Sequence, residues 1–125
     1  MSNPPDLAKK DLSHVNLASA NLAGADLHEA RLRNATLKET NLEGADLTSA
    51  DLSHANLAGA SLRNASASHA NLADADLRDT DLEGTNLRGA SLGGAKLDDA
   101  RRIAAEAAGA NFDGGGSEGE AASGG

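Results

Sequence analysis

The sequence has no cysteine, tryptophan or tyrosine, and Phe112 is its single aromatic residue. Without cysteine it can form neither a disulfide framework nor a thiolate metal site, which fits a reducing compartment. Ile103 and Val15 are also single occurrences of their residue types, so an ordinary core of mixed aromatic and branched side chains is excluded. No run approaches the roughly 18 apolar residues of a membrane-spanning helix, and the N-terminus does not resemble a signal peptide. We therefore expect a soluble, cytoplasmic protein.

The 125 residues carry a formal net charge of −8, from 19 acidic and 11 basic side chains. This charge argues against binding to phosphate-rich or anionic membrane surfaces and is compatible with a basic partner. It is equally compatible with a protein whose acidity only keeps it soluble.

Leucine recurs at every fifth position from Leu7 to Leu97 and occurs nowhere else. Leucine fills eighteen of these nineteen positions, and Ala67 stands in the remaining one. Two residues before the leucine positions and before Arg102, at positions 15 to 100 in steps of five, stand fourteen alanines, three threonines and Val15. The repeating unit is therefore Ala-(Asp/Asn)-Leu followed by two variable residues, as in ANLAGADL at residues 20–27.

A period of five residues fits neither regular secondary structure. An α-helix, at about 100° per residue, would distribute the leucines around its circumference, and a straight strand would alternate them between two faces. Alanine and leucine two residues apart do share one face of an extended segment. Each unit can therefore be a short extended side followed by a corner, so that the chain coils into a solenoid with leucine along its axis. Its coils are expected to lie about 4.8 Å apart and to pair through backbone amides.

At eight repeats the residue two places after the leucine is suited to a corner. A type II turn needs a positive φ at its third residue, which glycine and asparagine adopt at little cost. These residue types occupy the position at Gly24, Asn34, Gly44, Gly59, Asn64, Gly84, Gly89 and Gly94. Type II corners are therefore predicted.

These tandem units resemble the pentapeptide-repeat family, and the resemblance covers roughly residues 11–100. Nineteen units in one register make it far more specific than any single motif. The resemblance implies an all-β fold, a right-handed quadrilateral β-helix with four units in each coil and about five coils. Folded in this way, Ala67 lies between Leu47 and Leu87 in one axial column.

The pattern changes near both ends of the repeat region. Lys10 occupies an inward alanine position, so the regular wall is expected to begin near Val15, after a capping or flexible segment at residues 1–10. Pro4 and Pro5 in that segment should discourage pairing at the edge. At the other end Arg102 falls in a leucine position, where burial without a partner is costly, so the coils are expected to stop near residue 100.

Residues 101–112 are expected to form a short capping α-helix with a plug. The helical spacing places Ala100, Ile103, Ala104 and Ala107 on one apolar face, which is predicted to pack on the coils. Arg102 and Glu106 should pair at i,i+4, Asp99 should cap the N-terminus of the helix, and Gly109 should end it.

Two interpretations of the C-terminal apolar residues remain open. Phe112 either plugs the end of the core or contributes, with Ile103 and Ala107, to a homodimer through this end, which the family resemblance makes possible. Residues 113–125 are rich in glycine, serine and glutamate and are expected to be disordered.

Asp6, Asp26 and Asp46 fall into one outer column when the sequence is folded at four units per coil, and Glu29 lies beside it. This column is a possible acidic interaction site. Alternatively, aspartate and asparagine before the leucine are only the ordinary choice of the repeat and bond to the local backbone. His14 and His54 would lie two coils, or about 9.6 Å, apart, which is too far to share a metal ion.

No catalytic, cofactor or metal site is predicted, and the four histidines are interpreted as solvated surface residues. Ala67 is interpreted as a gap in core packing. A void of about one side chain is far smaller than the roughly 300 Å³ of the smaller ligand pockets.

The leading hypothesis is a non-enzymatic structural or protein-interaction module, a rigid rod that presents a binding surface to an unidentified protein. Binding to nucleic acid or membrane is not expected, and the rod is either a monomer or a homodimer through its C-terminal end. The alternative is a DNA mimic that binds DNA gyrase or another topoisomerase, as some members of the resembled family are thought to do. Five coils span about 24 Å, so −8 gives one charge per about 3 Å, whereas DNA carries one per about 1.7 Å. The sequence therefore favours the first hypothesis.

Overall fold

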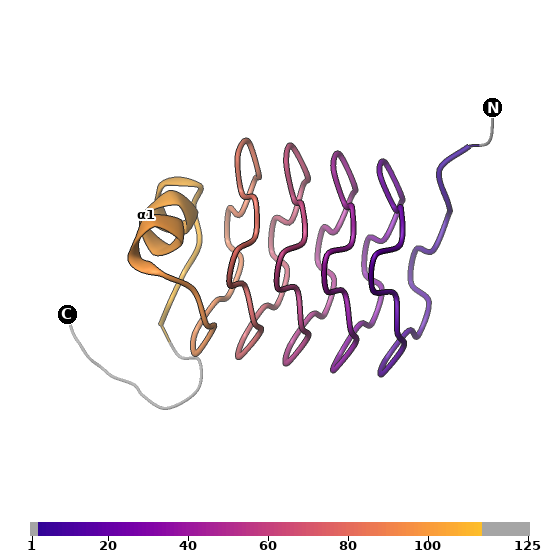
Figure 1. Cartoon of the computed structure of the whole chain (residues 1–125), viewed down its shortest axis with the longest axis horizontal. Helices are drawn as coiled ribbons and strands as arrows, with labels where there is room; N and C mark the ends of the chain where they lie inside the picture. The colour runs from indigo at the N-terminus through magenta and orange to yellow at the C-terminus, as the bar shows by residue number, and fades with distance from the viewer. Residues whose placement is uncertain (1–2, 114–125) are drawn as a thin grey trace.

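The computed structural model describes residues 3–113 as a solenoid of stacked coils (Figure 1). Equivalent residues in successive coils lie twenty positions apart, as in the parallel bridges Asp6–Asp26, Asp26–Asp46 and Asp46–Ser66. A turn recurs every five residues, so each coil of twenty residues has four sides. Within the described range, neighbouring coils meet through isolated bridges, one per side, and not through continuous strands.

Each regular side is joined to the next coil by three backbone hydrogen bonds. For example, the amide of Leu27 donates to the carbonyl of Asp46 at 2.7 Å, and that of Glu29 donates to Thr48 at 2.9 Å. The amide of Asp46 in turn donates to the carbonyl of Ala25 at 2.9 Å. Buried backbone amides and carbonyls need hydrogen-bond partners, and in this solenoid the neighbouring coil supplies them.

The corners are β-turns with a positive φ at the third residue. In one of them the amide of Ala30 donates to the carbonyl of Leu27 at 3.0 Å, and the third residue, Glu29, has a φ of 58°. Gly24 and Asn34, with φ of 71° and 59°, confirm the predicted corners. Lysine, histidine, serine, glutamate and aspartate also adopt this conformation at other corners, although it costs a residue with a side chain about 1–2 kcal/mol. Stacking against the neighbouring coil therefore overrides the local preference.

The inward alanines and leucines form one continuous core along the solenoid. Leucines from Leu27 to Leu92 expose 9% of their surface or less, and most expose 1% or less. Three threonines replace alanine in the inner wall, and each is buried with its hydroxyl donating to a backbone carbonyl. The bond from Thr85 Oγ1 to the carbonyl of Leu62 is 2.6 Å long. The walls can thus close around the leucines because their inward side chains are either small or hydrogen-bonded to the backbone.

Ala67 lies in the core, between Leu47 and Leu87 of the same axial column, and all three expose 1% of their surface. The bonds between coils at this point are close to the 2.7 Å found at Leu27. The amide of Leu47 donates to Ser66 at 2.6 Å, and that of Ala67 donates to Asn86 at 2.7 Å. The missing side chain has therefore not drawn the coils closer together.

The coils begin earlier than the sequence predicts. Asp6 already bridges Asp26, and the amide of Asp26 donates to the carbonyl of Pro5 at 3.0 Å. Lys10 is exposed in this first coil, where an inward position is covered by a neighbouring coil on one side only. The expectation that the wall starts near Val15 is wrong, because a lysine is tolerated where only one side of the coil is covered.

The described residues contain one helix, α1 (Asp99–Ala107), which begins two residues earlier than expected. Asp98, not Asp99, caps its N-terminus, since the Asp98 carboxylate accepts a hydrogen bond from the amide of Arg101 at 2.9 Å. Gly109 follows the C-cap with a φ of 102°, as expected for a glycine that ends a helix.

The predicted ion pair between Arg102 and Glu106 is confirmed, with Nε and Oε2 3.5 Å apart. The predicted packing face of the helix is wrong. Ala105 is fully buried, whereas Ile103 is 67% exposed, and the other members of the predicted face, Ala100, Ala104 and Ala107, are exposed too.

The orientation of α1 has two visible causes. Arg101 donates from Nε to the carbonyl of Thr80 at 2.6 Å, which ties its side of the helix to the last coil. Ala105 on the same side is small enough to let the helix lie close to the coil, which an isoleucine would prevent. Ile103 and Ala107 are therefore exposed on the outer surface of the helix, and their role in a dimer stays a prediction.

After α1 the chain returns to the ladder in register. Asn111 bridges Ser91, twenty residues earlier, and its amide donates to the carbonyl of Ala90 at 2.8 Å. Phe112 follows and is partly buried against the core. The guanidinium of Arg102 lies 4.1 Å from the centroid of its ring. α1 thus takes the place of two successive sides of a coil at the C-terminal end of the solenoid, those that would have bridged Asp81 and Asn86 (Figure 1).

Most of the tail for which disorder is expected, residues 114–125, lies outside the described residues, as do residues 1–2. In the described part of the chain, no helix has the length and apolarity that a membrane crossing requires.

Candidate functional site

The acidic column expected from the sequence is present on one side of the solenoid. Asp6, Asp26 and Asp46 follow one another through direct bridges, one coil apart. Asp6 is exposed, and Asp26 and Asp46 are half-buried. Glu29 is exposed at the corner that follows Asp26. The column continues through Ser66 without charge.

The aspartates of this column differ in their ion pairs from the other aspartates that directly precede a repeat leucine. Four such aspartates in other columns each have an arginine nitrogen within 4 Å of a carboxylate oxygen: Asp11 with Arg31, Asp51 with Arg33, Asp76 with Arg78 and Asp81 with Arg63. Among residues 3–113, no arginine or lysine lies that close to the carboxylates of Asp6, Asp26 or Asp46. The three aspartates without such a partner therefore all lie in one column.

His28 is the residue of this site that the sequence did not indicate. Its Nδ1 lies 2.7 Å from Oδ1 of Asp26, and its backbone amide donates to the same oxygen at 3.1 Å. The turn after Leu27 brings the two side chains together, with 35% of the His28 side chain and 44% of that of Asp26 exposed. The fragment ADLHEA carries the only available signal, a histidine two residues after an aspartate.

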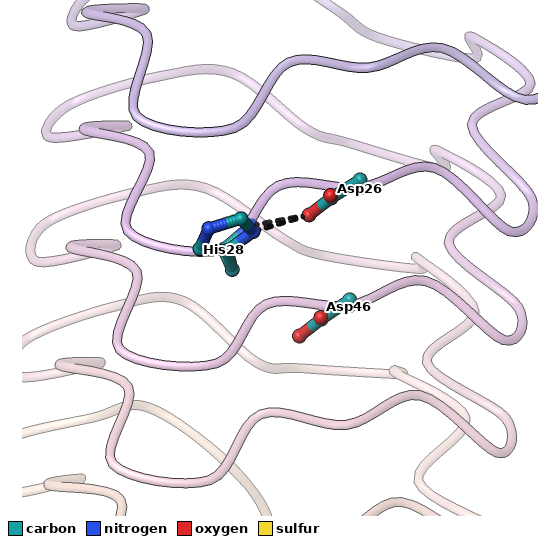
Figure 2. Close-up of side chains that lie close together, drawn as sticks. All are labelled: Asp26, His28 and Asp46. Atoms are coloured by element: carbon teal, nitrogen blue, oxygen red, sulfur yellow. Dashed lines mark hydrogen bonds and ion pairs between the residues drawn. The ribbon is translucent and has the colours of Figure 1, made fainter.

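Asp46 completes a group of three possible ligands. Figure 2 shows its carboxylate on the coil next to Asp26, on the same side as the ring of His28. One donor atom from each of Asp26, His28 and Asp46 lies within 4.8 Å of the other two. The Asp46 carboxylate also accepts a hydrogen bond from the amide of Thr48 at 3.0 Å, which holds it at this edge of the side.

The contact between Asp26 and His28 changes the protonation of both groups. The hydrogen bond from His28 lowers the pKa of Asp26, helped by the bond from the His28 amide. The same side-chain hydrogen bond raises the pKa of His28 above its usual value. The pair therefore favours an ionised carboxylate beside an imidazolium when no other cation is present.

The remaining residues weighed from the sequence do not join this group. His54, interpreted as a solvated surface residue, lies near Asp74 of the next coil, with Nε2 and Oδ2 3.6 Å apart. Ala67 is enclosed in the core, and Ile103, Ala107 and Phe112 belong to the C-terminal end. A shallow, open depression of about 350 Å³ lies between α1 and the last coil, beside Leu82 and Arg101.

The aspartates and asparagines before the leucines also have the local role that the sequence suggested. Their side-chain oxygens accept hydrogen bonds from the amide two residues later, as at Asn56 and Asp51, each at 3.0 Å. Because asparagine and aspartate make the same bond, the fold does not require the negative charge at these positions.

Comparison with known proteins agrees with the geometry. The sequence matches the family described as a pentapeptide repeat region over residues 10–92, and that described as pentapeptide repeats over residues 75–114. No curated protein sequence matches the chain.

Several solved pentapeptide repeat proteins are similar to this chain. One, from the thylakoid lumen of Arabidopsis thaliana, is 32% identical with a TM-score of 0.62, and the match covers 90% of this chain and 83% of that one. HetL, involved in heterocyst differentiation regulation in the cyanobacterium Nostoc sp. strain PCC 7120, is 35% identical with a TM-score of 0.55. That match covers 74% of this chain and 48% of HetL. Rfr23 from the cyanobacterium Cyanothece 51142 is 44% identical with a TM-score of 0.54, over 70% of this chain and 64% of that one.

The chain thus spans most of the Arabidopsis protein, about half of HetL and somewhat under two thirds of Rfr23. These structures imply that its four-sided coil is a right-handed quadrilateral β-helix. With the repeat, the coil and the family match in agreement, the chain belongs to the pentapeptide repeat family.

Proposed function

We propose that this protein is a non-enzymatic interaction module, a rigid β-helical rod whose acidic column binds a basic segment of a protein partner. The acidic column consists of Asp6, Asp26 and Asp46 with Glu29 beside it. The observation that supports the proposal is the pairing contrast. Equivalent aspartates elsewhere each have an arginine nitrogen within 4 Å, whereas within residues 3–113 Asp6 and Asp46 have no such partner and Asp26 contacts only His28.

The backbone supports the idea of a rigid scaffold. Every regular side is hydrogen-bonded to the next coil, and the leucine core is continuous. We take α1 and residues 108–112 to be the C-terminal cap of about five coils, since the amides of Leu87 and Leu92 donate to the carbonyls of Ala108 and Asn111. A surface built on such a frame binds without first having to be ordered.

The spacing of the column suits an extended basic segment. Carboxylates on successive coils recur about every 4.8 Å, and alternate side chains of an extended peptide recur about every 6.8 Å. Long, flexible lysine and arginine side chains can bridge that difference, and arginine is well suited to bind carboxylates through two hydrogen bonds. A segment with two or three basic residues at alternate positions is therefore the proposed ligand.

DNA mimicry with a topoisomerase as target is the weaker alternative. A mimic needs a continuous negative face, whereas arginines lie within the charged columns on the other sides. Arg63 contacts both Asp81 and Glu83, at 3.2 and 2.8 Å, and Arg78 contacts Asp76 at 2.6 Å. An assay of gyrase supercoiling with and without a quinolone tests this alternative directly, and protection by the protein would favour it.

The acidic column can be tested with two variants of equal net charge. In the column variant, Asp6, Asp26 and Asp46 are all changed to asparagine. In the control variant, the arginine-paired Asp11, Asp51 and Asp81 are changed to asparagine. Both changes remove three negative charges, and both should preserve the fold, because asparagine already makes the same turn at other repeats.

Binding of a lysine- and arginine-rich peptide is measured by fluorescence anisotropy, with a chelator present to exclude metal ions. An exposed ion pair contributes about 0.2–1 kcal/mol, so the column variant should lose roughly tenfold in affinity and the control little. Equal losses would show that only net charge matters. No loss in either variant would place any binding surface elsewhere on the rod.

A further inference from the structure

The group formed by Asp26, His28 and Asp46 contains an imidazole as well as two carboxylates, which distinguishes it from a simple acidic patch. Its three donor atoms lie within 4.8 Å of one another and come from two adjacent coils. All three side chains are partly buried. Imidazole with carboxylates is a donor set suited to zinc and neighbouring transition metals, whereas magnesium and calcium prefer oxygen alone.

The backbone that carries these donors is held in place. The amide of Leu27 donates to the carbonyl of Asp46 at 2.7 Å, and the amide of Asp46 donates to Ala25 at 2.9 Å, so the two coils cannot slide relative to each other. The amides of His28 and Thr48 donate to the carboxylates of Asp26 and Asp46. Donor atoms about 2.0–2.2 Å from a common ion lie at most about 4.4 Å apart, so rotations that close separations of up to 4.8 Å would let all three reach it.

The negative charge of the two carboxylates also favours binding of a cation. The two carboxylates lie one coil apart, and within residues 3–113 no arginine or lysine nitrogen lies within 4 Å of either. The histidine that faces them can offset one charge only when it is protonated. A divalent ion would neutralise both carboxylates and leave the imidazole neutral.

From this geometry we infer that Asp26, His28 and Asp46 bind one divalent transition-metal ion, of which Zn²⁺ is the simplest probe. Nδ1 of His28, the nitrogen that faces Asp26, would coordinate the ion after releasing its proton to solvent, and water would fill the remaining positions. No bond to carbon is made or broken, and no electron is transferred. The proposal rests on the column described for the proposed function, because the metal would occupy carboxylates that a basic partner would also use.

The test is a titration of the untagged full chain with Zn²⁺ alone, followed by isothermal calorimetry and by the NMR signals of the histidine rings. Three variants are compared: His28→Asn, Asp46→Asn and, as a control, His54→Asn. His54 is a matched control because it also lies near an aspartate of the next coil, Asp74, but has no second carboxylate among its ion pairs. Circular dichroism checks that each variant keeps the fold.

One Zn²⁺ per chain should bind, and the ring signals of His28 should shift most. His28→Asn and Asp46→Asn should each weaken binding by at least about tenfold, the lower end of the losses seen even for residues outside the coordination sphere. His54→Asn should bind as the unaltered chain does. Unchanged affinity in His28→Asn, an equal loss in His54→Asn, or no saturable binding below about 1 mM would overturn the proposal. Since no partner is present here and no metal in the peptide assay, each proposal can fail without the other.

Discussion

Replacing Ala67 with leucine should stabilise the protein, because it restores the missing side chain of an axial leucine column. Ala67 is buried, and its column neighbours Leu47 and Leu87 expose 1% of their surface each. The hydrogen bonds between coils on either side of Ala67 measure 2.6 and 2.7 Å, as short as those at leucine positions such as Leu27, where the bond is 2.7 Å. The backbone therefore still has the spacing that a leucine requires.

The size of the effect follows from the reverse substitution. Truncating a buried leucine to alanine costs about 2–5 kcal/mol, with the smaller values where neighbours relax into the space. Allowing for such relaxation, Ala67→Leu should add about 2 kcal/mol to the free energy of unfolding. For a domain of about 100 residues this raises Tm by about 8 °C or more. Thermal unfolding followed by circular dichroism measures the shift.

Ala70→Leu provides the matched control, since it adds the same atoms three residues away in the same coil. Ala70 belongs to the inner wall, where its equivalents Ala30, Ala50 and Ala90 are all buried alanines. Overpacking such a position costs about 1–3 kcal/mol, so Tm should fall. A fall in Tm for Ala67→Leu as well would refute the reasoning, because it would mean that the neighbouring side chains have already filled the space.

Gly109→Ala should destabilise the protein more than Gly44→Ala in urea unfolding, because an added Cβ would lie 2.8 Å from Cα of Arg88 at the first site and meets nothing within 4 Å at the second. Equal effects would mean that positive φ alone sets the cost. The arginine two residues after Asp76 lowers the pKa of that carboxyl below its usual 3.8. The resulting stabilisation is present above about pH 3.8 and is lost as the pH falls through the lower pKa of the folded state, so Asp76→Asn should flatten that part of the stability curve. A chain ending at Ala100 should melt at a lower temperature and exchange the amides of its last coil faster, since it lacks α1 and the segment that pairs after it. Light scattering on the full chain and on the chain ending at Ala100 tests the C-terminal dimer. A dimer requires that the full chain has twice its monomer mass and that the shortened chain is monomeric.

Much of the fold could be predicted from the sequence because one rule repeats in every unit. Leucine and alanine at fixed positions of every unit can all be buried only if they face inward and the chain turns a corner in each unit. A deviating residue at one position does not change this arrangement. Ala67 and Lys10 break the pattern without breaking the coil. The acidic column follows from the same register, since residues twenty positions apart must lie side by side.

Features that depend on a single contact were not predictable in this way. α1 is rich in alanine on several faces, so apolar content could not show that Ala105 packs inward and Ile103 outward. Arg101, on the same side of α1 as Ala105, donates to the Thr80 carbonyl, a contact that the sequence pattern does not encode. The contact between His28 and Asp26 was missed for a similar reason, because it depends on the turn within one unit and not on the spacing between coils.

The twenty-residue coil has a consequence for how such rods can change in length. Insertion or loss of one five-residue unit leaves every leucine facing the axis, because a corner follows each unit, but it moves all later outer residues to the neighbouring side. A unit inserted between Asp26 and Asp46 would thus separate the two carboxylates without disturbing the core. Only the insertion or loss of a whole coil of twenty residues preserves both the leucine core and the outer columns. Lengths that differ by single units are therefore compatible with folding, whereas a function carried by one outer column restricts insertions and deletions to complete turns.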